Sequence, residues 1–88
     1  MSVPKNIQFT NLIKVGGRLR EFNFRRSHST DGPVFTVDVA DDKGDRQYLI
    51  FHLNDKQWMF QGARPSGWIE DAFPRILEAI SAYSAQTQ

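Results

Sequence analysis

The sequence predicts an α+β domain in which one C-terminal helix covers one face of a four-stranded antiparallel meander. Residues 34–60 alternate polar and apolar side chains in three stretches separated by two turns, and residues 69–83 carry apolar side chains at helical spacing. The predicted strands lie at about 18–26, 34–40, 46–53 and 57–61, and the predicted helix at about 72–84. The sequence leaves open whether the N-terminal residues 1–17 add a further strand to the sheet.

The turn at 41–45 sets the register of the two central strands. Asp42-Lys43-Gly44 fits a three-residue hairpin loop with glycine in the left-handed position. The predicted pairs are Val39 with Gln47, Val37 with Leu49 and Phe35 with Phe51. A four-residue loop would slip the partner strand by one residue and turn its apolar side chains to the other face.

The turn between the predicted strands at 46–53 and 57–61 keeps the apolar side chains of both strands on one face. A two-residue loop at Asp55-Lys56 and a four-residue loop at 54–57 both place Leu53 opposite Trp58 and Phe51 opposite Phe60. Neither loop contains glycine, so Asn54 or Asp55 is expected to carry any positive φ.

The strand at 18–26 precedes a polar loop at 27–32. Placing Phe24 opposite Phe35 completes an aromatic row across the sheet: Phe24, Phe35, Phe51 and Phe60. The same register sets Glu21 opposite Asp38, a like-charge contact that Arg46 would have to neutralise.

Residues 1–17 allow two interpretations. Ile7, Phe9, Ile13 and Val15 alternate as in a strand, whereas Phe9, Leu12 and Ile13 also match a short helix that ends at Gly16-Gly17. A two-residue hairpin at the glycines would place Ile13 opposite Arg20 and Val15 opposite Arg18. These pairs of an apolar with a charged residue are unfavourable. The pattern therefore favours an extended segment or strand with an irregular joint.

The C-terminal helix presents one apolar stripe, formed by Ile69, Phe73, Ile76, Ile80 and Tyr83. Pro74 is tolerated only in the first helical turn, so Asp71 is predicted as the N-cap, after a separate turn at 67–70. Residues 84–88 are expected to fray.

Composition indicates a single domain over residues 1–88. The chain has 40% hydrophobic residues, no cysteine and a net charge of +1. A chain this short buries only about 60–65% of its unfolded surface, so a partner subunit would help. The absence of cysteine, of a signal segment and of a long apolar run leads us to expect a cytoplasmic protein without a membrane partner.

No pattern points to catalysis, a cofactor or a metal. The stretch Asp41–Asp45 superficially suggests a calcium loop, but His52 stands where that loop needs a bidentate glutamate. His28 and His52 are too few for a convincing metal site. We therefore expect a non-enzymatic binding module.

The predicted face away from the helix mixes basic, aromatic and apolar side chains. The candidate binding residues are Arg18, Asn23, Arg25, Arg46, Tyr48, Ile50, His52 and Met59. Basic and aromatic groups could hold single-stranded nucleic acid by pairing and stacking. The alternative is a homodimer or protein-protein interface centred on Val34, Ile50 and Met59, and a third interpretation is an ordinary solvated face.

The order of four strands followed by a helix over residues 18–84 is similar to one repeat of the Pur-alpha family and to the Whirly proteins. That resemblance rests on topology and implies modules that pair to hold single-stranded nucleic acid. No family motif is matched residue by residue.

Overall fold

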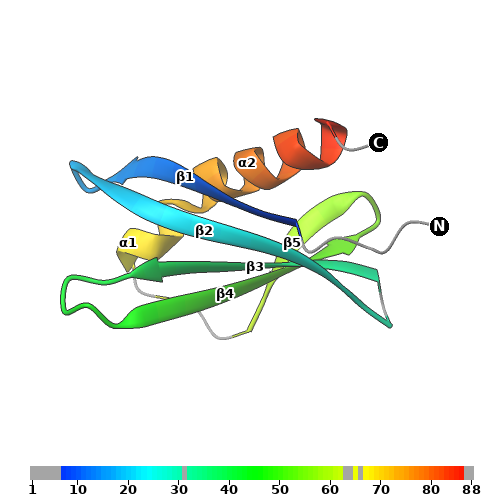
Figure 1. Ribbon diagram of the computed structural model, residues 1–88, viewed down its shortest axis with the longest axis horizontal. Coiled ribbons are helices and arrows are strands. Elements are labelled where there is room, and N and C mark those ends of the chain that lie inside the picture. The colour runs from blue at the N-terminus through cyan, green and yellow to red at the C-terminus, as the bar shows by residue number, and fades with distance from the viewer. Residues whose placement is uncertain (1–6, 31, 63–64, 66, 87–88) are drawn as a thin grey trace.

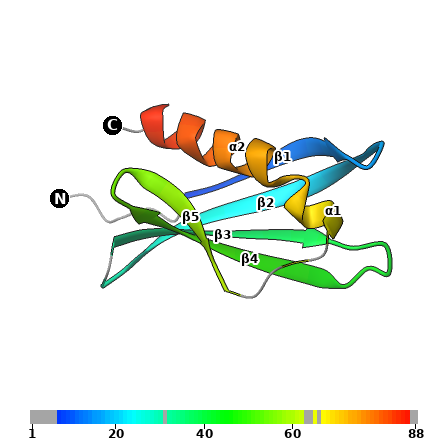
Figure 2. The same ribbon diagram turned by 180° about the vertical axis from the view of Figure 1, so that it is seen from behind.

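The computed structural model describes residues 7–30, 32–62, 65 and 67–86. The elements in chain order are β1 (Ile7–Val15), β2 (Arg18–Ser29), β3 (Gly32–Ala40), β4 (Arg46–Asn54), β5 (Gln57–Gln61), α1 (Gly67–Glu70) and α2 (Phe73–Gln86). The five strands form one antiparallel meander in the order β1-β2-β3-β4-β5. Figures 1 and 2 show both helices on the same side of this sheet. The predicted α+β fold is therefore confirmed, with β1 as the extra N-terminal strand.

The register from β3 to β5 is as predicted. Phe35 pairs with Phe51, and Phe51 pairs with Phe60. In the first turn the Asp41 amide donates to the Asp45 carbonyl at 2.8 Å, and Gly44 has a φ of 87°. The second turn is the two-residue loop, in which Asp55 and Lys56 both have positive φ, at 52° and 70°. Asn54, the other residue considered for that conformation, does not share it.

The predicted register between β2 and β3 is wrong by two residues. Phe24 pairs with Val37, and Asn23 rather than Glu21 lies opposite Asp38. The hairpin is longer than predicted, because Ser29 still pairs with Gly32 and His28 with Pro33. A shift of two residues leaves every side chain on its predicted face, so the apolar alternation could not detect it.

The joint between β1 and β2 is a regular two-residue hairpin at Gly16-Gly17 and not the irregular joint that the sequence favours. Gly16 and Gly17 have φ values of 60° and 79°, as a two-residue turn of type I′ requires, and Ile13 pairs with Arg20. The prediction of an irregular joint at Gly16-Gly17 is therefore wrong. Arg20 is accommodated because its guanidinium carbon lies 4.2 Å from the ring centroid of Trp68 in α1.

The core lies between the helices and one face of the sheet. The fully buried large side chains are Phe22, Phe24, Phe35, Phe51, Ile69, Ile76, Ile80, Val37 and Val39. The α2 helix crosses the sheet obliquely, since the Phe73 ring lies 5.5 Å from Phe51 on β4 and the Tyr83 ring lies 4.7 Å from Phe9 on β1. The amphipathic stripe predicted for the helix is thus the surface that meets the sheet.

The ends of α2 differ slightly from prediction. The helix begins one residue later than predicted, because the Ile76 amide donates to the Ala72 carbonyl and Asp71 belongs to the turn after α1. Pro74 is its second residue, where no intrahelical bond is lost. The helix continues to Gln86, so residues 84–86 are helical, and residues 87 and 88 lie outside the described range.

Candidate functional site

The sheet surface opposite the helices is called the free face. Its members alternate with the core residues, and in the described part of the chain neither helix covers it (Figures 1 and 2). It consists of Gln8, Thr10, Leu12, Lys14, Leu19, Glu21, Asn23, Arg25, Ser27, Val34, Thr36, Asp38, Ala40, Arg46, Tyr48, Ile50, His52, Asn54, Gln57, Met59 and Gln61. Seven of the eight predicted site residues lie on it.

Arg18 is the exception. Its alternation places it with the core-facing residues of β2, and its Nη1 atom pairs with Asp42 Oδ1 at 2.9 Å. Arg20 Nη2 donates to the same carboxylate oxygen at 2.7 Å. Arg18 therefore belongs to a turn-stabilising cluster and does not join the other candidates.

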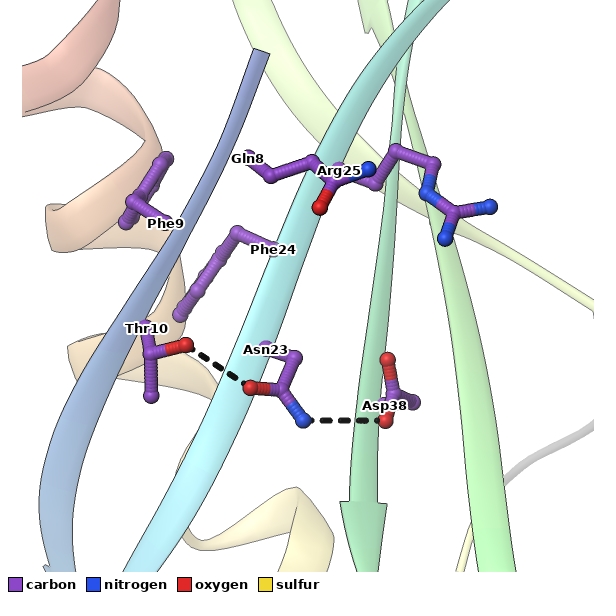
Figure 3. A pocket seen from close by; sticks show the side chains of 7 residues that line it. All are labelled: Gln8, Phe9, Thr10, Asn23, Phe24, Arg25 and Asp38. Carbon is purple, nitrogen blue, oxygen red and sulfur yellow. Dashed lines mark hydrogen bonds between the residues drawn. The ribbon is translucent and has the colours of Figure 1, made fainter. Parts of the chain in front are cut away.

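A row of hydrogen bonds crosses the free face from β1 to β4. The Thr10 hydroxyl donates to Asn23 Oδ1 at 2.8 Å, and Asn23 Nδ2 donates to Asp38 Oδ2 at 3.2 Å (Figure 3). Arg46 Nη1 donates to the same Asp38 oxygen at 3.0 Å. Because an ionised carboxylate only accepts, it fixes the Asn23 amide with its nitrogen toward Asp38. Two predicted binding residues, Asn23 and Arg46, are thus already engaged within the chain.

A hollow of about 400 Å³ lies beside this row. It is lined by Gln8, Phe9, Thr10, Asn23, Phe24, Arg25 and Asp38. Figure 3 shows Phe9 and Phe24 pointing toward the helix side, so the exposed wall is polar. Gln8 and Thr10 were missed by the sequence analysis because the register of β1 was left open; the alternation of Phe9, Ile13 and Val15 would have placed them on this face.

Apolar side chains form two exposed groups on the free face. Tyr48 and Ile50 on β4 are 67% and 41% exposed, and Met59 on β5 is 45% exposed. Since Met59 pairs with His52, next to Ile50 on the same face, these three form one apolar strip, called the β4–β5 strip. Leu12 and Leu19 form the second group on the β1–β2 hairpin. Among the large apolar residues described as exposed, only Leu53 lies elsewhere.

The strand residues of the free face have nearly balanced charge. Lys14, Arg25 and Arg46 are cationic, and Glu21 and Asp38 are anionic, which gives a net charge of +1. Asp38 and Arg46 neutralise each other. Within the described ranges Glu21 and Arg25 form no ion pair or hydrogen bond, so they remain available to a partner.

Two carboxyl groups in the β3–β4 turn have lowered pKa values. For Asp42, the hydrogen bond and charge of Arg20 act first and Arg18 adds to them, holding the pKa below its ordinary 3.8. For Asp41, partial desolvation raises the pKa, but amide donors of Asp45 and Lys43 outweigh it and the net direction is downward. Both groups favour ionisation in the folded chain.

Acid should therefore weaken the fold partly through Asp42. The unfolded chain binds more protons on this carboxyl, so its stabilising contribution is present above about pH 4 and is lost as the pH falls through the lower folded pKa. When the pH is lowered from about 5 to about 2.5, we expect the free energy of unfolding to fall by less in Asp42→Asn than in wild type, as measured by urea titrations. Asp45→Asn, in the same turn, is the control, and parallel profiles for wild type and Asp42→Asn would contradict the assignment.

The described residues include neither a cluster of metal ligands nor a helix that could span a membrane. They contain no group of three or more His, Cys, Asp or Glu side chains placed to hold a metal ion. The helices among them are too short or too polar to cross a membrane.

Comparison with known proteins finds no matching family model, no matching curated protein and no matching solved structure. No comparison supports the resemblance to Pur-alpha and Whirly modules, which was inferred from four strands followed by a helix, and the sheet has a fifth strand, β1.

Proposed function

We propose that this protein is a small, non-enzymatic binding module whose free face associates with the free face of a second copy. The observation that carries the proposal is the β4–β5 strip, in which Tyr48 and Ile50 follow each other on one face of β4 and Met59 lies diagonal to Ile50, all three exposed. Exposed apolar clusters of this kind are typical of interaction surfaces. The internal pairing of Asp38 with Arg46 also lowers the cost of removing water from the middle of the face.

The dimensions of the face suit such an association. The five strands have 9, 12, 9, 9 and 5 residues. At about 3.3 Å per residue and about 4.8 Å between strands, they cover a projected area of roughly 700 Å². This area approaches the accessible area of about 800 Å² that each partner buries in a standard interface. Two sheets packed face to face stand about 10 Å apart, so the exposed side chains of both copies would interdigitate.

Ile50→Glu tests this proposal. The variant places a charge in the β4–β5 strip without touching the core, so we expect a folded monomer where the wild type is a dimer. Light scattering measures the mass, and circular dichroism verifies the fold. Ser81→Glu adds the same charge on an exposed position of α2 and should leave the wild-type mass unchanged. A wild type that stays monomeric at tens of micromolar would refute the proposal.

Single-stranded nucleic acid is the second candidate, supported by Arg25, which lines the polar hollow and has no ion-pair partner among the described residues, and by the exposed Tyr48. Arg25 could neutralise a phosphate while Tyr48 stacks on a base. Because the charge of the free face is nearly balanced, the face favours nucleic-acid binding less than apolar association with a second copy. A labelled random 20-nucleotide strand separates the two, because phosphate binding falls steeply with salt and Arg25→Ala would flatten that slope by about one unit.

A further inference from the structure

We propose that association of the two free faces requires His52 of each copy to lose its proton, so that the copies bind each other at neutral pH and separate in mild acid. This inference rests on the proposed function and adds the regulation of the same surface. Its basis is the position of His52 beside the apolar side chains of the β4–β5 strip, together with the charges of the elements around it.

His52 lies among the apolar side chains of the free face. It pairs with Met59 of β5 on one side and with Val34 of β3 on the other, and Ile50 precedes it on the same face of β4. The fourth neighbour is the uncharged Asn54, whose Nδ2 atom donates to Met59 Sδ at 3.6 Å. The imidazole therefore has apolar neighbours on three sides, and a partner that covers the β4–β5 strip also covers this ring.

A proton on His52 is not compensated by a carboxylate of the same copy. The ring forms no ion pair with the described residues. The charged residues of the free-face strands, whose backbone positions all lie more than about 10 Å from His52 by strand and residue spacing, are Lys14, Glu21, Arg25, Asp38 and Arg46. The nearest of them, Arg25, is itself cationic, and Figure 3 shows its side chain directed toward β3. Asp55 in the β4–β5 turn is followed by Lys56, which carries the opposite charge.

Association changes the surroundings of this ring. In a single copy the side chain of His52 is partly exposed, so water solvates its protonated form. Because the proposed association is carried by the β4–β5 strip, the ring of one copy comes to face the apolar strip of the second copy. A buried charge without a partner is strongly unfavourable, whereas a neutral polar ring is buried at a much lower cost. Protonation therefore favours the separated copies.

The size of the effect follows from the number of protons that are released. Histidine is the side chain whose charge ordinarily changes between about pH 8 and about pH 5. A free histidine is about nine-tenths neutral at about pH 7.5 and about nine-tenths protonated at about pH 5.5. At the lower pH, loss of this proton weakens association by about tenfold for each copy. Since a dimer holds two copies, we expect its dissociation constant to rise by roughly a hundredfold from about pH 7.5 to about pH 5.5.

Substitutions of the two histidines test this coupling. Light scattering at the two pH values measures the dissociation constant, and circular dichroism verifies the fold at both. His52→Gln and His52→Leu remove the titrating group, so each should associate equally at the two pH values, whereas His52→Lys should be a folded monomer at both. His28→Gln is the matched control, because His28 is the other histidine of the chain and lies exposed on the opposite face of the sheet, where it pairs with Pro33. This control should keep the pH dependence of wild type.

The outcomes separate this inference from the proposed function. If wild type dimerises equally well at both pH values, or if the two neutral variants keep its pH dependence, the coupling is wrong and association through the free face stands. Failure of both neutral variants to associate would show that the ring itself is required, and this would also overturn the coupling. Stronger association in mild acid would overturn it as well, since an acidic group of the second copy, such as Glu21, would then face the ring. A wild type that is monomeric at both pH values would refute the proposed function and this inference together.

Discussion

Replacing Phe51 with alanine should lower the free energy of unfolding by about 3–5 kcal/mol, the usual cost of removing a fully enclosed aromatic side chain. Phe51 has no exposed surface. Its ring lies 5.7 Å from Phe60 and 5.5 Å from Phe73, so it joins β4 to β5 and to the first turn of α2. The cavity left by alanine would lie under the helix, where neighbouring side chains are held by both layers.

Urea denaturation monitored by circular dichroism measures this loss. Tyr48→Ala is the matched control, because Tyr48 lies three residues away on the same strand and is 67% exposed on the other face. We expect the control to change the unfolding free energy of the monomer by less than about 0.5 kcal/mol. Equal losses in the two variants would contradict the placement of the helix.

Replacing Arg20 with methionine should cost about 2 kcal/mol, because three contacts end together. The side chain is only 13% exposed. Its guanidinium covers the ring of Trp68, donates to Asp42 at 2.7 Å and donates to the Ala40 carbonyl at 3.3 Å. The paired register of β2 and β3 ends at Asn23 and Asp38, so Arg20 holds the two strands together beyond that point. Figure 1 shows the β1–β2 and β3–β4 hairpins diverging there, with α1 beside the gap.

Arg18→Met provides the comparison for Arg20. Arg18 contacts the same Asp42 oxygen, but its side chain is 68% exposed, so we expect a loss below about 1 kcal/mol. Arg20→Lys should fall between the two, because a single ammonium group cannot cover an indole ring and reach both oxygens at once. Thermal and urea unfolding measure the series. A cost for Arg20→Met no larger than that for Arg18→Met would show that α1 and the strand ends are held by other contacts.

Most of the candidate binding face could be predicted from the sequence. Tyr48, Ile50 and His52 were placed on the surface away from the helix because the phase of β4 follows from its turn and its alternation. Gln8 and Thr10 of the hollow were not placed, although the alternation of Phe9, Ile13 and Val15 indicates their face, because accepting β1 as a paired strand required an explanation for Ile13 opposite Arg20. The internal engagement of Asn23 and Arg46 also escaped prediction, because it depends on which β2 residue lies opposite Asp38.

The amino-acid sequence alone determined the strand phases, the register of β3 with β4 and β5, and the helical stripe. These features depend on neighbours in the chain: glycine at a left-handed position, side chains alternating at a period of two, and apolar residues repeating every three or four. Tertiary structure decided the β2–β3 register and the pairing of β1. A shift of two residues preserves both faces, and an arginine opposite isoleucine is acceptable only once Trp68 and Asp42, both more than twenty residues away in the chain, have come to surround it.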